Sequence, residues 1–66
     1  MSVVLQGIVS RVIYSKDGWT VARLTEDVTD REYSFVGNMG TVIGEHLELT
    51  GNWNTHVDFG DQFKVN

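Results

Sequence analysis

The chain has 66 residues, 41% hydrophobic and 21% charged, which suits one small globular domain. It has no cysteine, which excludes disulfides and thiolate metal sites, and no apolar run approaches the roughly 20 residues needed to span a membrane. Nine acidic residues outnumber five basic ones, so the net charge of −4 argues against tight, autonomous binding of nucleic acid.

The first half of the chain predicts a hairpin. Residues 3–14 are rich in Val, Ile and Leu without a helical stripe, so they predict a long strand. Gly7 in its middle predicts a bend or a close approach of backbone, as at a barrel corner. Residues 15–18 predict a tight turn because Gly18 tolerates positive φ. Residues 19–26 carry β-branched and aromatic residues at strand spacing and form the second strand.

A third strand is predicted over residues 32–38, after a polar turn. Tyr33 and Phe35 share one of its faces, since residues two apart in a strand point the same way. The following segment holds two glycines, too many for a short stable helix. We therefore expect a loop there, from which Val42 and Ile43 reach into the core.

Residues 46–54 predict a fourth strand with one buried and one wet face, as in an antiparallel sheet. After a loop, residues 62–66 predict a fifth strand. Five short strands, the first long and bent, predict an all-β fold: a partly open, five-stranded antiparallel barrel with little or no helix. We expect residues 1–66 to form this single domain, as a fragment of a longer polypeptide.

Short groups of residues along nearly the whole chain carry a family resemblance. They are Gly7-Ile8-Val9 with Val12-Ile13-Tyr14, Gly18-Trp19-Thr20-Val21 with Arg23-Leu24, Val36-Gly37-Asn38, Gly44-Glu45 with Leu47, Leu49-Thr50-Gly51 and Trp53, and His56 with Phe59-Gly60 and Gln62-Phe63. In this order and spacing the chain resembles the N-terminal OB-type domain of RecD-like ATP-dependent DNA helicases, the family related to the exodeoxyribonuclease V alpha subunit. The last group is the most specific.

The resemblance implies that the parent protein is a cytoplasmic, ATP-driven helicase that moves on single-stranded DNA in recombination and repair. Its motor domains would follow this segment and would bind ATP and Mg²⁺. The segment itself has no Gly-x-x-x-x-Gly-Lys-Ser/Thr loop to hold phosphates, so we expect it to hydrolyse no ATP and to hold no cofactor.

Catalytic and metal sites are not expected in this chain. Its two histidines, His46 and His56, lie far apart in sequence, whereas catalytic zinc needs about three convergent protein ligands. His46 is expected on the solvent face of its strand. The acidic pair Glu26-Asp27 lies in a polar turn, where solvated carboxylates are the common case. We therefore expect the domain to act by contact rather than by chemistry.

The stronger hypothesis is that the domain contacts single-stranded nucleic acid by stacking aromatic side chains on its bases. Barrels of this type bind single strands with exposed aromatic residues beside basic ones. Lys16, Trp19, Arg23 and Tyr33 are therefore the predicted nucleic-acid-binding residues, and Arg23 shares a strand face with Trp19. The sequence leaves open whether Trp19 and Tyr33 are exposed or belong to the core. Three further aromatic residues are assigned to the core: Phe35, Trp53 and Phe63.

The alternative is a protein-docking module with no nucleic-acid binding of its own. In that case His56 and Phe59 would be exposed for a partner, either the helicase motor domains or another repair or replication protein. The structural interpretation of the same two residues is that they pack together and orient the last strand. A free-standing barrel with a small ligand is a third possibility, which no residue supports.

Overall fold

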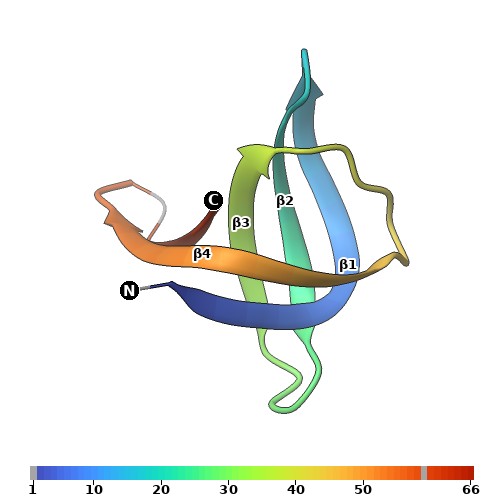
Figure 1. The fold of residues 1–66 in the computed structure, drawn as a ribbon, viewed down its shortest axis with the longest axis vertical. Helices are drawn as coiled ribbons and strands as arrows, with labels where there is room; N and C mark the ends of the chain where they lie inside the picture. Colours follow the sequence, from blue (N-terminus) through green and yellow to red (C-terminus); the bar gives the residue numbers. More distant parts are fainter. Residues whose placement is uncertain (1, 59) are drawn as a thin grey trace.

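A computed structural model of the chain describes residues 2–58 and 60–66, except for the side chain of His56. The described part forms five strands: β1 (Val3–Lys16), β2 (Trp19–Glu26), β3 (Glu32–Asn38), β4 (His46–His56) and β5 (Gly60–Val65), shown in Figure 1. The predicted all-β fold is confirmed. Over the described residues no helix is long and apolar enough to cross a membrane.

The strands close into a barrel in the order β1-β2-β3-β5-β4. Four neighbouring pairs are antiparallel, and β1 takes part in two of them because it pairs with β2 and with β4. The ring closes between β3 and β5, which run parallel over only three residue pairs. The predicted five-stranded barrel is therefore confirmed, and this short parallel junction is what closes it.

β1 serves two neighbours because it bends along its length (Figure 1). Gly7 pairs with Glu26 of β2 and with Leu47 of β4, so backbone lies on both sides of it. A Cβ atom at this position would overlap the carbonyl oxygen of Thr25. The predicted close approach at a barrel corner is confirmed, because only glycine leaves room for it.

The β1–β2 hairpin turns at two residues, Asp17 and Gly18. Their φ angles are 52° and 83°, the positive values that a tight two-residue hairpin turn requires. Asp-Gly is a favoured pair for this turn, so the turn prediction is confirmed. The turn places Lys16 directly opposite Trp19 at the end of the hairpin.

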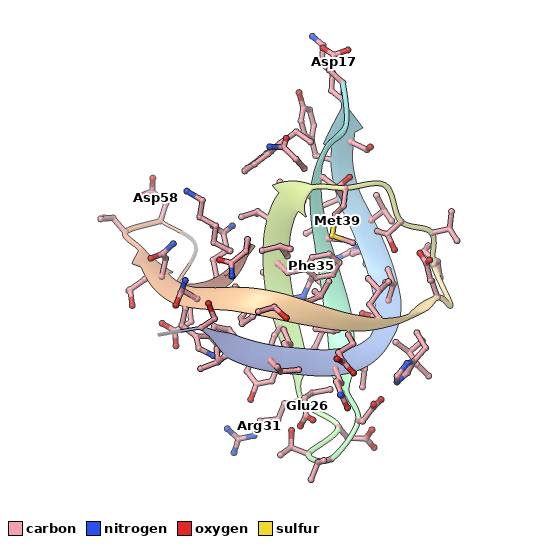
Figure 2. All side chains as sticks on the ribbon, in the orientation of Figure 1. Asp17, Glu26, Arg31, Phe35, Met39 and Asp58 are labelled. Carbon is pink, nitrogen blue, oxygen red and sulfur yellow. The ribbon has the colours of Figure 1, made fainter. Side chains whose placement is uncertain are left out.

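The core fills the inside of the barrel with alternate side chains from every strand. Its buried members are Leu5, Val9, Ala22, Leu24, Phe35, Leu49 and Phe63. Figure 2 shows Phe35 within the ring of strands. The core assignment is confirmed for Phe35 and Phe63, which have no exposed surface, but it is wrong for Trp53, which is 42% exposed. Trp53 packs edge-on against Phe63 and Tyr33 and covers the edge of the core.

The loop between β3 and β4 contributes its backbone to the fold rather than its aliphatic side chains. The prediction that Val42 and Ile43 enter the core is wrong, because each is 67% exposed. The backbone N–H of Gly44 donates to the carbonyl of Val9, and the Val9 N–H donates to Glu45. These two bonds hold the loop against β1. Within the loop, Met39 packs against the core.

Candidate nucleic-acid interface

Two irregularities in β1 determine which of its side chains point outward. The register of β1 against β2 shifts at Ser10 and again at Ile13. Each shift leaves an extra residue without a cross-strand partner and reverses the alternation beyond it. The outward pairs that result are Arg11 with Arg23, Tyr14 with Val21 and Lys16 with Trp19.

The same surface continues over β3 and β5. Arg23 lies opposite Ser34, and Ser34 lies opposite Gln62 of β5. Two residues farther along each strand, Val21 pairs with Val36, and Val36 pairs with Lys64. We call this surface the outer face, formed by Arg11, Ile13, Tyr14, Lys16, Trp19, Val21, Arg23, Glu32, Ser34, Gln62 and Lys64, whereas Val36 is buried.

The outer face is basic although the chain is acidic. It carries four of the five Lys and Arg residues: Arg11, Lys16, Arg23 and Lys64. The fifth, Arg31, lies in the β2–β3 loop, at the end of the barrel opposite the hairpin tip at Asp17 (Figure 2). Several acidic residues lie at that end of β2, in the loop, or at the start of β4: Glu26, Asp27, Asp30, Glu45 and Glu48. The carboxylate of Glu32 also lies on this side, bound to Arg23, so the cations of the outer face outnumber its carboxylates and can attract phosphates despite the net charge of the chain.

A pocket of about 360 Å³ opens in the outer face. Its lining comes from four strands: Ile13, Tyr14, Val21, Arg23, Ser34 and Gln62. Tyr14 is half exposed, and so is Ile13. An aromatic ring and aliphatic groups beside a guanidinium, a hydroxyl and an amide can together contact the flat face of a base, its polar edge and a neighbouring phosphate.

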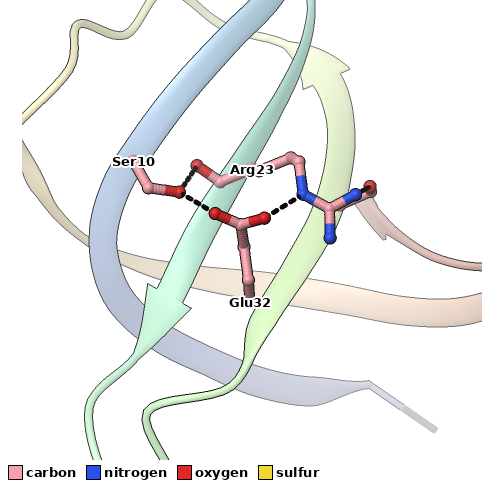
Figure 3. A network of polar contacts seen from close by, with 4 residues as sticks. Ser10, Arg23 and Glu32 are labelled. Atoms are coloured by element: carbon pink, nitrogen blue, oxygen red, sulfur yellow. Dashed lines mark hydrogen bonds and ion pairs between the residues drawn. The ribbon is translucent and has the colours of Figure 1, made fainter.

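Arg23 is held at the edge of this pocket by a polar network (Figure 3). Its Nε donates to a Glu32 carboxylate oxygen at 2.6 Å, and its Nη1 donates to the Ser34 hydroxyl at 3.0 Å. The Ser10 hydroxyl donates to the other Glu32 oxygen at 2.8 Å. These bonds from Ser10 and Arg23, with the positive charges of Arg23 and Arg11, lower the pKa of Glu32, so this carboxylate is ionised at neutral pH.

Three of the four predicted nucleic-acid-binding residues come together on the outer face. Lys16 and Trp19 pair at the end of the hairpin, and Arg23 lies farther along the same side of β2. Trp19 is 36% exposed, so part of its ring is accessible.

Tyr33 does not join the other three. It lies opposite Leu24, on the side of the sheet that faces the core, and is only partly exposed. Its ring meets Trp53 edge-on, with 5.1 Å between centroids. The reason is the alternation of β3, which places Tyr33 on the same side as the buried Phe35. We therefore leave Tyr33 out of the candidate interface.

The two predicted partner-contact residues fall outside the described part. The backbone of His56 pairs with Gly60 at the end of the β4–β5 hairpin, but its side chain is not described. Phe59 also lies outside the described residues.

The sequence reasoning missed Arg11, Tyr14 and Lys64. It predicted one long strand over residues 3–14 and assigned no side to its residues, so it did not anticipate that Arg11 and Tyr14 face outward. One signal was present: the inward apolar residues Val9 and Val12 are three apart rather than two, a break in period that indicates a bulge.

Outside the outer face, His46 is exposed, as predicted, and its Nε2 lies 2.7 Å from a carboxylate oxygen of Asp27. Among the side chains that the structure describes, no group of three or more His, Asp or Glu residues is arranged to hold a metal ion.

Comparison with known families gives a match over residues 2–66, to the family described as ATP-dependent DNA helicase YrrC, OB-fold domain. Neither a curated protein nor a solved structure matches the chain. The family match spans all five strands and therefore includes every residue of the outer face.

Proposed function

Since the chain belongs to the family of OB-fold domains of the ATP-dependent DNA helicase YrrC, we propose that its outer face binds single-stranded DNA on behalf of a helicase motor. One observation carries this proposal: four of the five basic residues lie on one face with the exposed rings of Tyr14 and Trp19. Barrels of this fold bind oligonucleotides on the side formed by the second and third strands.

The chemistry assigns different roles to the residues of the outer face. The exposed cations Arg11 and Lys16 attract backbone phosphates, while Tyr14 and Trp19 offer ring faces to successive bases. Each stacked base contributes about 1–3 kcal/mol, and stacking tolerates any base because every base has a π-face. The domain would therefore hold a strand weakly and without sequence preference, as a moving motor requires.

In this proposal the domain is an accessory without catalytic chemistry. ATP and Mg²⁺ would be bound by motor domains in the longer protein, and recombination or repair would be the setting. Docking on those motor domains without any DNA contact is the competing function. The net charge of −4 favours docking for the isolated domain, whereas the basic outer face favours DNA.

Fluorescence anisotropy of a labelled oligothymidylate tests the electrostatic part. Arg11→Gln and Lys16→Gln should each weaken binding and reduce the slope of log affinity against log salt by about 0.7, the value for one phosphate contact on a single strand. The matched control is Arg31→Gln, which removes the same charge away from the outer face. An equal effect of all three variants would show that only net charge matters and would contradict the proposal.

The stacking part is tested with Tyr14→Ala and Trp19→Ala. Each should reduce the free energy of binding by about 1–3 kcal/mol in the same assay. The amide NMR spectrum of each variant checks that the barrel remains folded. If the unmodified domain binds no oligonucleotide even at low salt, the DNA function is wrong and docking is the better explanation.

A further inference from the structure

Donors from two strands converge on one carboxylate beside the pocket. Glu32 receives the Arg23 Nε–H at 2.6 Å and the Ser10 hydroxyl at 2.8 Å, and the charge of Arg11 also acts on it. A hydroxyl and a guanidinium that donate to a single anion, with a second positive charge acting on it, form a setting that can also hold a phosphate. Here an acidic side chain of the protein occupies that position.

We propose that Glu32 is a built-in competitor of DNA: its carboxylate occupies a phosphate position on the outer face, and the incoming strand must displace it from Arg23. This inference rests on the proposed function and deepens it. It assigns to Glu32 the role of limiting affinity, which neither the fold nor the family match assigns.

The geometry allows the exchange without disturbing the fold. Both partners of the ion pair are partly accessible, with side-chain exposures of 33% for Arg23 and 46% for Glu32. Ion pairs at such positions are weak, so a phosphate can replace the carboxylate. The Ser34 hydroxyl holds a different nitrogen of the guanidinium. Arg23 therefore stays in place when Glu32 leaves, with its Nε–H free for the phosphate.

The exchange has a measurable consequence for the salt dependence. When a phosphate replaces Glu32 on Arg23, the DNA gains one contact with a cation. The displaced carboxylate stays nearby and repels the phosphate, so the net gain in binding is small. Removing the carboxylate charge should make Arg23 a full phosphate contact. The slope of log affinity against log salt should then increase by about 0.7.

The test compares Glu32→Gln with Glu48→Gln by anisotropy of a labelled oligothymidylate. Both variants remove one negative charge, and Glu48 is an exposed carboxylate on β4 that binds the side chain of Gln6. Glutamine at position 32 can accept the Arg23 Nε–H with its amide oxygen and donate from its amide nitrogen to the Ser10 hydroxyl, so the barrel is expected to stay folded. We expect Glu32→Gln to bind about two- to fivefold more tightly than Glu48→Gln, the gain corresponding to release from an exposed ion pair.

A second experiment tests whether the tighter DNA binding of Glu32→Gln depends on Arg23. In an Arg23→Gln background, the advantage of Glu32→Gln over Glu48→Gln should shrink, as the coupling of two contacting residues requires. In the unmodified domain, the Arg23 Nε–H NMR signal should shift when oligothymidylate is added. A signal that does not move in a domain that binds the oligonucleotide would overturn the exchange.

The outcomes separate this inference from the proposed function. If the unmodified domain binds DNA and Glu32→Gln binds no better than Glu48→Gln, the competitor role is wrong and the DNA function stands. Weaker binding by Glu32→Gln would show that Glu32 positions Arg23, which also overturns the inference. If only Glu32→Gln binds, the competitor role holds and the unmodified domain is not a DNA binder. If neither binds, both proposals fail.

Discussion

Gly51 shows how a single residue can be required by the packing of its neighbours. It lies on β4 opposite Val65 of β5 and opposite Val3 of β1. A Cβ atom there would overlap the backbone carbonyl oxygen of Lys64, an atom that cannot rotate away. The missing side chain is therefore what allows β4 and β5 to lie so close.

Gly51→Ala is accordingly expected to destabilise the domain by about 1–3 kcal/mol or more, the range for overpacking a tight site. Urea unfolding followed by circular dichroism measures the change. Gly40→Ala is the matched control, because a Cβ atom at Gly40 has open space around it. Equal urea midpoints for Gly51→Ala and Gly40→Ala would show that β4 and β5 can move apart at Gly51 at little cost.

Two carboxylates make stability depend on pH. The backbone N–H of Val28, the hydroxyl of Thr29 and the Thr29 N–H all donate to Glu26, which lowers its pKa. Bonds from Ser10 and Arg23 do the same for Glu32. A carboxylate with a pKa lowered by folding stabilises the protein fully above its ordinary pKa, and that stabilisation is lost as the pH falls through the folded-state pKa.

The domain should therefore lose stability as the pH falls from about 5 toward 3. Glu26→Gln should be less stable than the unmodified domain near neutral pH and should lose less stability on acidification. Urea midpoints measured at several pH values provide the comparison. Parallel curves for the two proteins would mean that the bonds to Glu26 do not contribute.

At the scale of elements, the β1–β2 hairpin links local turn chemistry to the candidate interface. The turn at Asp17 and Gly18 needs positive φ at both residues. It places Lys16 and Trp19 side by side, next to the pocket in the outer face. Strain in the turn would therefore affect the fold and the position of two proposed DNA contacts.

Gly18→Ala should cost about 1–2 kcal/mol of stability, because an L-residue with a side chain is disfavoured at a φ of 83°. The urea midpoint should fall with an unchanged m value. Asp17→Asn is the control, since asparagine adopts positive φ readily and should leave stability nearly unchanged. A Gly18→Ala variant as stable as the control would show that the turn can take another form.

β1 itself shows what a strand-level prediction leaves out. Its existence and the close approach of backbone at Gly7 follow from composition and from a glycine in an apolar run. The two bulges follow from how β1 fits against β2, and a regular alternation does not anticipate them. They place Arg11 and Tyr14 outside, so they build much of the outer face.

At the scale of the whole molecule, the order of strands assembles the interface from distant segments. β5 follows β4 in sequence but also pairs with β3. This parallel pairing brings Gln62 and Lys64 to the same surface as Arg23, although they are far away along the chain. The closed ring also gathers four of the five cations on the outer face, where Glu32 is paired with Arg23.

The sequence by itself determined the five strands, the Asp17-Gly18 turn, the corner at Gly7 and the burial of Phe35 and Phe63. These features follow from alternation and backbone chemistry, which act between residues close in the chain. The tertiary structure alone decided that Trp53 is half exposed and that Arg11, Tyr14 and Lys64 share a surface with Arg23. Those outcomes depend on register between strands, and a shift of one residue reverses the side that every later residue faces.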